Sequence, residues 1–298
     1  MSGTTTTRLK MALQKSGRLS DRSRELLARA GIDCEWRTGR LDCRCVDFPL
    51  DIMLVRDDDI PRYVADGVCD LGIVGSNMLA ERLGGDDGNG RVEVLRRLGF
   101  GHCRLSVAAP ETSGIRSAAD LDGRRIATSY PETTRAFCAR LGIKASIVEI
   151  GGSVEVAPAM GVADVICDLV STGATLQAHG LTEISPVLAS EAVLVRSPRV
   201  LGEPREEALA RLLVRLSGAL RAERAKYIMM NAPAAAVEAI RRIIPGLEEP
   251  TVMPLSGDRH RVAVHAVAPE PIFWETMEKL KAAGASSILV VPIEKIIE

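Results

Sequence analysis

The chain has 298 residues, of which 46% are hydrophobic and 26% charged, so it can bury a core and is not an intrinsically disordered protein. Its length exceeds that of one ordinary compact domain, and we expect two or three domains. The net charge of -1 provides no global basic field, which argues against nucleic acid as the main partner.

The N-terminal residues are polar, and the longest apolar runs fall far short of the ~20 residues that span a bilayer. We therefore expect a cytoplasmic protein with no membrane partner. Most of the seven cysteines lie singly in apolar segments, which is typical of reduced core cysteines. Cys43 and Cys45 form a Cys-x-Cys pair, but no second Cys or His pair completes a zinc set.

The first third of the chain alternates strand and helix patterns. We expect strands at 8–13, 51–55 and 69–74 and a helix at 19–30. A second helix follows Asp59, which can cap it, with Pro61 in its first turn and Gly67 at its end. This βαβ rhythm predicts a mostly parallel sheet.

A second cycle of the same kind begins after residue 120. It predicts strands at 125–129, 145–150 and 163–170, and a helix from Pro131 to Gly142. Short helices follow 151–153 and 171–173. Residues 161–168 resemble residues 67–74, which suggests two similar lobes. Two apolar strands, 103–109 and 192–195, could cross between them, and a ligand cleft would lie at the lobe interface.

The last part of the chain has a different order of elements. An amphipathic helix at 206–224 is followed by a β-α-β-β-α-β pattern, which is that of the ferredoxin-like unit. Its expected strands are 227–230, 251–255, 262–267 and 287–291, and its helices are 234–243 and 272–283. We expect a third domain here.

The strongest chemical motif is the stretch 168–176, in which a strand delivers an acid to a small hydroxyl-and-glycine loop before a helix. The amide groups at the helix start, with the hydroxyls of Ser171, Thr172 and Thr175, can cradle a phosphate monoester, and Gly173 lets the backbone close on it. Asp168 can accept hydrogen bonds from ribose hydroxyls. The alternative is an ordinary strand-turn-helix with a Ser/Thr cap.

Three further kinds of loop could hold anions. Lys15 and Arg18 follow the first strand, where they can contact phosphates or form a solvated basic turn. Arg56 leaves another strand and precedes three aspartates that could bind magnesium or be solvated around a helix cap. The junctions 128–135 and 151–155 have the same strand-to-helix character. We find no Walker A, Rossmann or catalytic histidine pattern.

Several segments together resemble the long form of the ATP phosphoribosyltransferases, the first enzymes of histidine biosynthesis. The resembling segments are 9–20, 55–61, 70–75, 125–131, 153–158, 168–176, 273–280 and 284–289. The resemblance implies condensation of ATP with phosphoribosyl pyrophosphate (PRPP) to N1-(5-phosphoribosyl)-ATP and pyrophosphate, with Mg²⁺ held mainly through the substrate phosphates. The protein ligands of that metal are not identified.

The resemblance also implies a fold. It predicts an α/β chain with a bilobal periplasmic-binding-protein-like (type II) catalytic region and a C-terminal ferredoxin-like (ACT-like) regulatory domain. Lobe I would span 1–105 and be completed by about 190–224. Lobe II, with the PRPP loop, would span 106–189, and the regulatory domain 225–298. A homo-oligomer is implied, a hexamer with a dimeric form.

The family's functional residues carry over to matching positions. PRPP would bind Asp168, Leu169, Val170, Ser171, Thr172, Gly173, Ala174, Thr175 and Leu176. ATP or pyrophosphate would meet Lys15, Arg18 and Arg56, with Asp70 and Glu155 near the cleft, and Lys15, Arg18 and Asp168 would be catalytic. Histidine, an inhibitor together with AMP, would bind Asn231, Leu247, Thr251, Val267 and Ser287. Glu249 stands where a smaller polar residue is possible in relatives.

Three other functions remain open from the residues alone. The same lobes could form a solute-binding module without catalysis. A phosphoribosyltransferase could act on another base or nucleotide, since only the family resemblance selects ATP. The C-terminal pattern by itself would also fit an amino-acid-sensing regulator.

Overall fold

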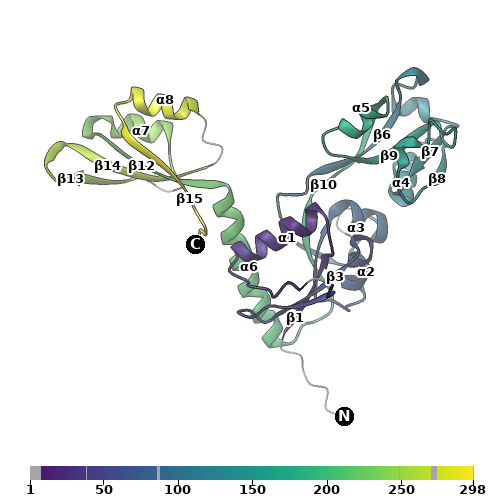
Figure 1. The fold of residues 1–298 in the computed structure, drawn as a ribbon, viewed down its shortest axis with the longest axis horizontal. Helices are drawn as coiled ribbons and strands as arrows, with labels where there is room; N and C mark the ends of the chain where they lie inside the picture. The colour runs from purple at the N-terminus through teal and green to yellow at the C-terminus, as the bar shows by residue number, and fades with distance from the viewer. Residues whose placement is uncertain (1–7, 38, 86–87, 248, 270–273, 298) are drawn as a thin grey trace, which may run out of the picture. The chain divides into compact units, whose positions relative to one another are not determined.

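The structure of the chain is a computed structural model that describes residues 8–37, 39–85, 88–247, 249–269 and 274–297. Across these residues the strands form three sheets, of six, five and four strands (Figure 1). The chain divides into two compact units, one of Met1–Glu25 with Ile32–Leu209 and the other of Leu26–Gly31 with Ala210–Glu298. The first two sheets belong to the first unit and the third sheet to the second.

The six-stranded sheet consists of β1 (Leu9–Gln14), β2 (Asp42–Arg44), β3 (Leu50–Val55), β4 (Leu71–Gly75), β5 (Glu93–Arg97) and β11 (Ala192–Arg196). Its strand order is β2-β3-β1-β4-β11-β5. β1 is parallel to β3 and β4, whereas β11 is antiparallel to β4 and β5. The strands at the centre of this sheet are apolar and buried, as is usual for strands that are covered on both faces.

The five-stranded sheet consists of β6 (Cys103–Pro110), β7 (Arg125–Thr128), β8 (Ser146–Glu149), β9 (Val165–Val170) and β10 (Leu181–Ser190). Its order is β10-β6-β9-β7-β8, with β7 parallel to β8 and β9, and β6 antiparallel to β9. The parallel triplets β3-β1-β4 and β8-β7-β9 have the same order, and each is followed by an antiparallel strand. β4 and β9 are equivalent, which confirms the internal similarity expected from 67–74 and 161–168.

The helices of the first unit follow the strands as the sequence predicts. They are α1 (Arg18–Arg29), α2 (Ile60–Ala65), α3 (Ser76–Leu83), α4 (Pro131–Leu141) and α5 (Ala174–Ala178), and the longer α6 (Glu203–Glu223) begins in this unit. α4 shows why the boundaries were predictable. Pro131 supplies the φ angle of a first helical residue, and Gly142 ends the helix at a φ of 70°, which glycine adopts without strain.

The second unit contains an antiparallel sheet of β12 (Ala225–Pro233), β13 (Thr251–Leu255), β14 (Asp258–Pro269) and β15 (Ser286–Pro292), with helices α7 (Val237–Ile243) and α8 (Trp274–Ala282). The sheet order is β13-β14-β12-β15, and the expected β-α-β-β-α-β order is confirmed. Both helices pack on one face of the sheet (Figure 1). That face is the core of the unit, which includes Ile228, Val264, Ile240 and Leu280.

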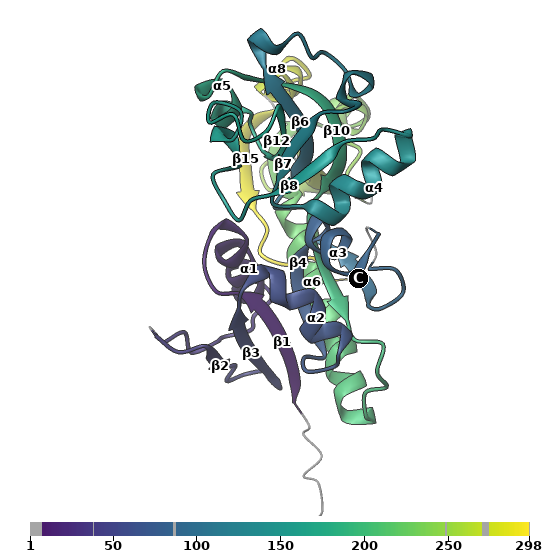
Figure 2. The same ribbon diagram turned by 90° about the vertical axis from the view of Figure 1, so that its right-hand side faces the viewer.

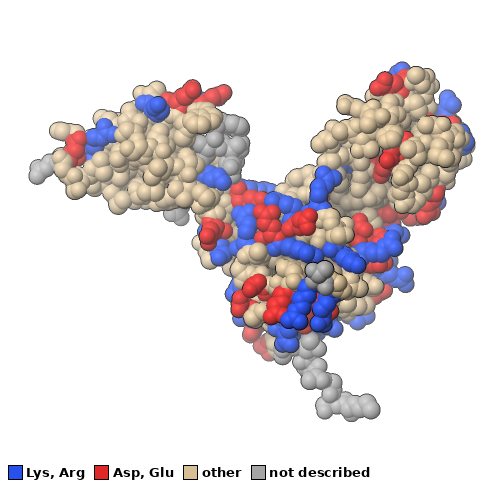
Figure 3. Space-filling model, in the orientation of Figure 1, with Lys and Arg blue, Asp and Glu red and all other residues tan. Residues whose placement is uncertain are grey.

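The other face of this sheet has no helix among the described residues. Leu289 and Val291 of β15 are 55% and 41% exposed, and they pair across the sheet with Met229 and Tyr227 of β12. The surface of this unit drawn in Figure 3 is largely free of charged side chains.

Several expectations from the sequence were wrong. Both sheets of the first unit are mixed rather than mostly parallel, because antiparallel β11 and β6 join them. The strands β2, β5 and β10 were not expected. The segments 103–109 and 192–195 do not cross between sheets: each lies within one sheet as β6 and β11. Asp59 occupies the cap position of α2, but its side chain makes no capping hydrogen bond.

Most of the cysteines are free thiols, as expected from the sequence, but one pair is not. Cys34 and Cys45 form a disulfide, because a short antiparallel bridge brings their Cα atoms to 4.1 Å. Cys43, the other member of the Cys-x-Cys pair, is a free buried thiol. Within the described residues, no helix is long and apolar enough to cross a membrane.

Candidate functional site

A pocket of about 500 Å³ lies between the six-stranded and five-stranded sheets of the first unit. One side is lined from the first sheet and its helices, and the other from the second. The lining residues are Gln14, Arg18, Leu19, Arg22, Asp57, Gly75, Asn77, Met78, Gly101, His102, Cys103, Tyr130, Leu169 and Ser171. The pocket therefore collects residues from four of the segments that the sequence marked as possible anion sites, represented by Arg18, Asp57, Tyr130 and Ser171.

The first of these loops joins β1 to α1. The Lys15 amide donates to the Val55 carbonyl at 2.8 Å, and Gly17, at a φ of 97°, turns the chain into the helix. Arg18 opens α1 and lines the pocket. Lys15 is placed differently: it lines a separate cavity of about 200 Å³ with Arg24 and Trp36.

The second loop joins β9 to α5. Gly173, at a φ of 84°, is the cap residue of α5, and the Ala174 amide lies 3.5 Å from the Thr172 hydroxyl. The first amides of a helix have no partner within it, so they are free to bind an anion. Leu169 and Ser171 line the pocket, whereas residues 172–176 are not among the lining residues.

Asp168 lies within β9, two residues before the strand ends at Val170, and is half-buried. Its carboxylate accepts a hydrogen bond from the Leu169 amide at 2.8 Å. Burial raises the pKa of Asp168 above the usual range, the Leu169 hydrogen bond works against this shift, and the charge of Glu155 adds to it. A carboxylate held in this way is a ready acceptor for sugar hydroxyls.

Tyr130 connects the two sides of the pocket and was not singled out in the sequence. Its ring packs against the cores of both sheets, and its hydroxyl accepts a hydrogen bond from the Asn77 amide at 3.3 Å. Burial, followed by the charges of Asp168 and Asp57, raises the pKa of Tyr130, so the phenol remains protonated. The only sequence signal was its position in the junction 128–135.

Two other polar groups were also missed. Arg104 of β6 donates to the Ser171 carbonyl at 3.4 Å while it holds Glu183 of β10 in an ion pair at 2.5 Å. This pair lowers the pKa of Glu183. Cys103 lines the pocket, and burial raises the pKa of its thiol while the nearby Arg18 charge lowers it. None of Arg104, Glu183 and Cys103 belongs to a motif that the sequence alone marks.

The aspartate cluster and its arginine lie at the margin of the pocket. Asp57 lines it, whereas the Arg56 side chain is 81% exposed and pairs with Asp58 at 3.3 Å. Glu155, in the short 3₁₀ turn Val154–Val156, is half-buried and near enough to Asp168 to act on its pKa. The preceding Ser153 adopts a φ of 51°, a strained conformation that clusters at functional sites.

Asp70 is not brought to the pocket. It precedes β4, whose other end, Gly75, lines the pocket. Its carboxylate accepts from the Lys10 amide at 2.9 Å and pairs with Arg205 at 2.8 Å. These contacts connect β1 and α6 to the start of β4, at the amino end of the parallel strands. Parallel strands bind ligands at their carboxyl ends, and this rule could have removed Asp70 from the candidates.

No group of three or more His, Cys, Asp or Glu side chains within the described ranges is placed to hold a metal ion. Asp57 is the carboxylate that lines the pocket. Mg²⁺ in phosphate-handling enzymes is commonly bound by one or two carboxylates and by substrate phosphates. The donor set therefore fits a magnesium ion that arrives with the substrate rather than a closed protein site.

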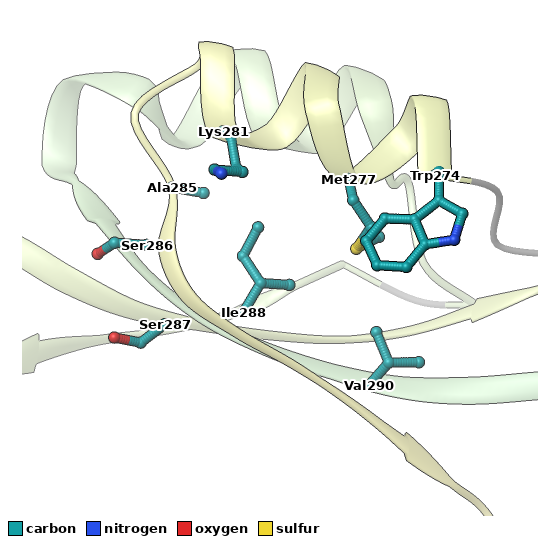
Figure 4. A pocket seen from close by; sticks show the side chains of 8 residues that line it. All are labelled: Trp274, Met277, Lys281, Ala285, Ser286, Ser287, Ile288 and Val290. Atoms are coloured by element: carbon teal, nitrogen blue, oxygen red, sulfur yellow. The ribbon is translucent and has the colours of Figure 1, made fainter.

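A second pocket, of about 730 Å³, lies between α8 and β15 in the second unit (Figure 4). Its walls are apolar, with one amine and two hydroxyls, and it is lined by Trp274, Met277, Lys281, Ala285, Ser286, Ser287, Ile288 and Val290. Of the five residues proposed to bind histidine, Ser287 lines this pocket. It adopts a φ of 50° at an irregularity in β15.

The other four candidates for histidine binding lie along the sheet instead. The Leu247 amide donates to the Val267 carbonyl at 3.0 Å, and Thr251 pairs with His265 next to it. Asn231 accepts a hydrogen bond from the Ser286 hydroxyl at its carbonyl. The five residues thus fall into two groups within the second unit: Leu247, Thr251 and Val267 form one, and Asn231 and Ser287 form the other.

Two family models match the chain, and each covers a different part of it. A family model described as HisG, ATP phosphoribosyltransferase, matches residues 56–218, and one described as HisG, C-terminal domain, matches residues 222–295. The chain is similar to the ATP phosphoribosyl transferase (HisG:HisZ) complex from Thermotoga maritima, with 28% identity and a TM-score of 0.60 over 70% of this chain and 96% of that chain.

Solute-binding proteins also show similarity. The alkanesulfonate-binding protein SsuA from Xanthomonas axonopodis pv. citri is 16% identical, with a TM-score of 0.45 over 93% of this chain and 90% of that chain. The family matches and the sheet topology confirm the α/β fold class expected from the sequence, a bilobal periplasmic-binding-protein-like region followed by a ferredoxin-like domain.

Proposed function

The chain belongs to the ATP phosphoribosyltransferase family, and from this membership we propose that the pocket between the two sheets of the first unit is where ATP is joined to PRPP. The enzyme is a pentosyltransferase of histidine biosynthesis. One observation carries the proposal: a single pocket is lined both by Arg18 from the first anion-binding loop and by Ser171 from the second.

The loop 168–176 binds the phosphoribosyl group in this proposal. Amides and hydroxyls from Ser171 to Thr175 hold the 5′-phosphate, and Asp168 accepts hydrogen bonds from the ribose hydroxyls. Arg18 faces ATP or pyrophosphate. Lys15 and Arg56 contribute positive charge to ATP or pyrophosphate from positions that do not line the pocket. Glu155 contributes its charge near Asp168. The left-handed turn at Gly173 before α5 and the half-buried Asp168 carboxylate support this division.

The chemical step is a displacement at the anomeric carbon of PRPP. A bond forms from N1 of adenine to this carbon, while the bond to pyrophosphate breaks and its electron pair leaves with the pyrophosphate. N1 has a free lone pair, so no strong general base is required. Positive charge develops on the ribose, which the Asp168 carboxylate stabilises, and Arg18 stabilises the leaving group. Orientation of the two substrates supplies up to about 7–11 kcal/mol.

Mg²⁺ is the proposed cofactor. Asp57 on the pocket wall offers a carboxylate ligand of the kind that Mg²⁺ binds. The remaining ligands come from substrate phosphates and water. When bound, the ion neutralises charge on the pyrophosphate group.

The second unit carries the proposed regulation. Histidine, and AMP at the nucleotide site, inhibit the enzyme. Histidine binds at the group formed by Leu247, Thr251 and Val267 together with Asn231 and Ser287. The apolar face beside these residues supports a homo-oligomer, a hexamer with a dimeric form. Biosynthesis from ATP and PRPP supports a cytoplasmic location. The expected division into lobes at 1–105 and 106–189 and a domain at 225–298 remains part of the proposal.

The assignment of the pocket is tested with the purified full chain. ATP, PRPP and Mg²⁺ are mixed, and the rise in ultraviolet absorbance of the adduct is followed with and without histidine. Arg18→Ala should lower kcat/KM by about 10²–10³-fold, since one charged contact in the transition state is removed. Arg62→Ala is the matched control, because Arg62 is exposed and, among the described residues, forms its ion pair locally with Asp66. Normal turnover of Arg18→Ala would place the reaction elsewhere.

A further inference from the structure

The N-terminus of α4 has no capping side chain of its own. Its cap residue, Tyr130, makes no side-chain capping bond, and Pro131 in the first position has no N–H. The Thr134 amide donates to the Tyr130 carbonyl at 3.0 Å. Two first-turn donors, the amides of Glu132 and Thr133, therefore need partners from elsewhere in the fold.

Glu81, 51 residues away on α3, supplies both partners. One carboxylate oxygen accepts from the Glu132 amide at 3.0 Å, and the other accepts from the Thr133 amide at 2.9 Å and hydroxyl at 2.8 Å. Glu81 is 7% exposed, and no Lys or Arg in the described chain is paired with it. The positive end of the α4 dipole thus balances a buried carboxylate.

The same face of α3 also holds Tyr130. Asn77 is one helical turn before Glu81, so both side chains point to one side of α3. The Asn77 side-chain amide donates to the Tyr130 hydroxyl, and its oxygen accepts from the Ser190 hydroxyl at 2.8 Å. α3 follows the first sheet and α4 the second, and the two helices lie side by side (Figures 1 and 2). The contact therefore joins the two halves around the pocket.

We propose that Glu81 is a positioning residue for the phosphoribosyl transfer: by capping α4 from the opposite half, it fixes Tyr130 in the pocket wall and the spacing of the two anion-binding loops. This inference rests on the proposed function of the pocket. Glu81 is not among the residues that line the pocket, so it acts on alignment. Its loss lowers kcat more than it changes the KM for ATP or PRPP.

The test is a double-mutant cycle with Glu81→Gln and Tyr130→Phe in the full chain. The glutamine is nearly isosteric but replaces one acceptor oxygen by a donor, which opposes the Thr133 amide. We expect kcat of Glu81→Gln to fall at least about tenfold with each KM within about threefold, because small misalignments are costly. The double variant should lose less than the product of the two single losses, since the residues act as one unit.

Glu132→Gln is the matched control. It removes a carboxylate from the same helix turn, but that side chain pairs with Arg135 alone within the described part of the chain and takes no part in the cap. Its kcat should stay within about twofold of the unaltered enzyme, as for an ordinary surface substitution. If Glu81→Gln does not fold, Thr133→Val removes only the hydroxyl contact and should lower kcat in the same direction, by a smaller factor.

Three results would overturn the inference. They are unchanged kcat in Glu81→Gln, losses in the cycle that multiply independently, and a loss of activity that matches only the loss of folded protein in a thermal unfolding assay. Failure of the pocket assignment has a different signature, because Tyr130→Phe and Arg18→Ala would then each be as active as the unaltered enzyme.

Discussion

Asp168 combines a proposed role in binding with a cost to the fold. Burial raises its pKa above that of an unfolded chain, so the folded state binds a proton more readily than the unfolded state. The contribution of this residue to stability therefore decreases as the pH rises from the ordinary Asp pKa through the raised one. At neutral pH the ionised carboxylate is destabilising.

We predict that Asp168→Asn is inactive but more stable than the unaltered chain at neutral pH, by about 0.5–2 kcal/mol, as is common when a functional group is relieved of its burial cost. The gain should shrink as the pH falls through the raised pKa. Urea unfolding at a series of pH values measures this. A constant difference, or a less stable variant at pH 7, would contradict the assignment.

Asp164 provides a control of opposite sign. Its hydrogen bonds from Arg125 lower its pKa, so its stabilising contribution is present above the ordinary Asp pKa and is lost as the pH falls through the lowered value. Asp164→Asn should therefore destabilise the protein at neutral pH, with a loss that fades in acid.

At the scale of residues, the sequence predicted what local chemistry determines. Arg18 and Ser171 were marked because charge, hydroxyls and glycine follow a strand, and both line the pocket. The sequence did not mark Tyr130, Asn77 and Glu81, because their roles depend on contacts with residues that lie 50 or more positions away in the chain. No pattern in a single segment carries that information.

Among the elements, the turn from β9 into α5 offers the sharpest test of the PRPP loop. Gly173 has a φ of 84° and open space around its Cα, so an added methyl group meets only backbone strain. Gly173→Ala should cost about 1–3 kcal/mol locally and raise the KM for PRPP by moving the loop amides. Steady-state kinetics with varied PRPP measures this change.

Gly142→Ala is the matched control for that experiment. Gly142 has a φ of 70° and equally open surroundings, but it ends α4 away from the loop. It should lose similar stability and keep its KM for PRPP. An equal rise in KM for both variants would show that strain alone, and not the loop, affects binding.

The elements that the sequence missed have a physical reason in common. β10 is an edge strand with Pro186 inside it and two irregularities in register with β6, so no regular alternation marks it. β5 is also an edge strand, and β2 has three residues. In contrast, the central strands and α4 carry apolar runs, proline and glycine at their ends, which is why they were predictable.

For the whole molecule, the uncovered face of the four-stranded sheet is the feature to test. Leu289→Glu places a charge on this face, opposite Met229, and should shift the protein to a smaller particle in size-exclusion chromatography with light scattering, because burying an unpaired charge is costly. Met160→Glu is the control, since Met160 is 72% exposed in the other unit. An unchanged mass for Leu289→Glu would rule this face out as the contact.

The placement of β11 has a consequence for synthesis on the ribosome. The second sheet is built from one continuous stretch, 103–190, whereas the first sheet needs β11, which is inserted between β4 and β5. Nascent chains that end before residue 192 can complete the later half but leave the earlier half with a gap between two strands. In this protein the sheet that is begun first is thus completed only after the second sheet, and its unpaired strand edges await a partner that emerges about a hundred residues later, at roughly 5–20 residues per second.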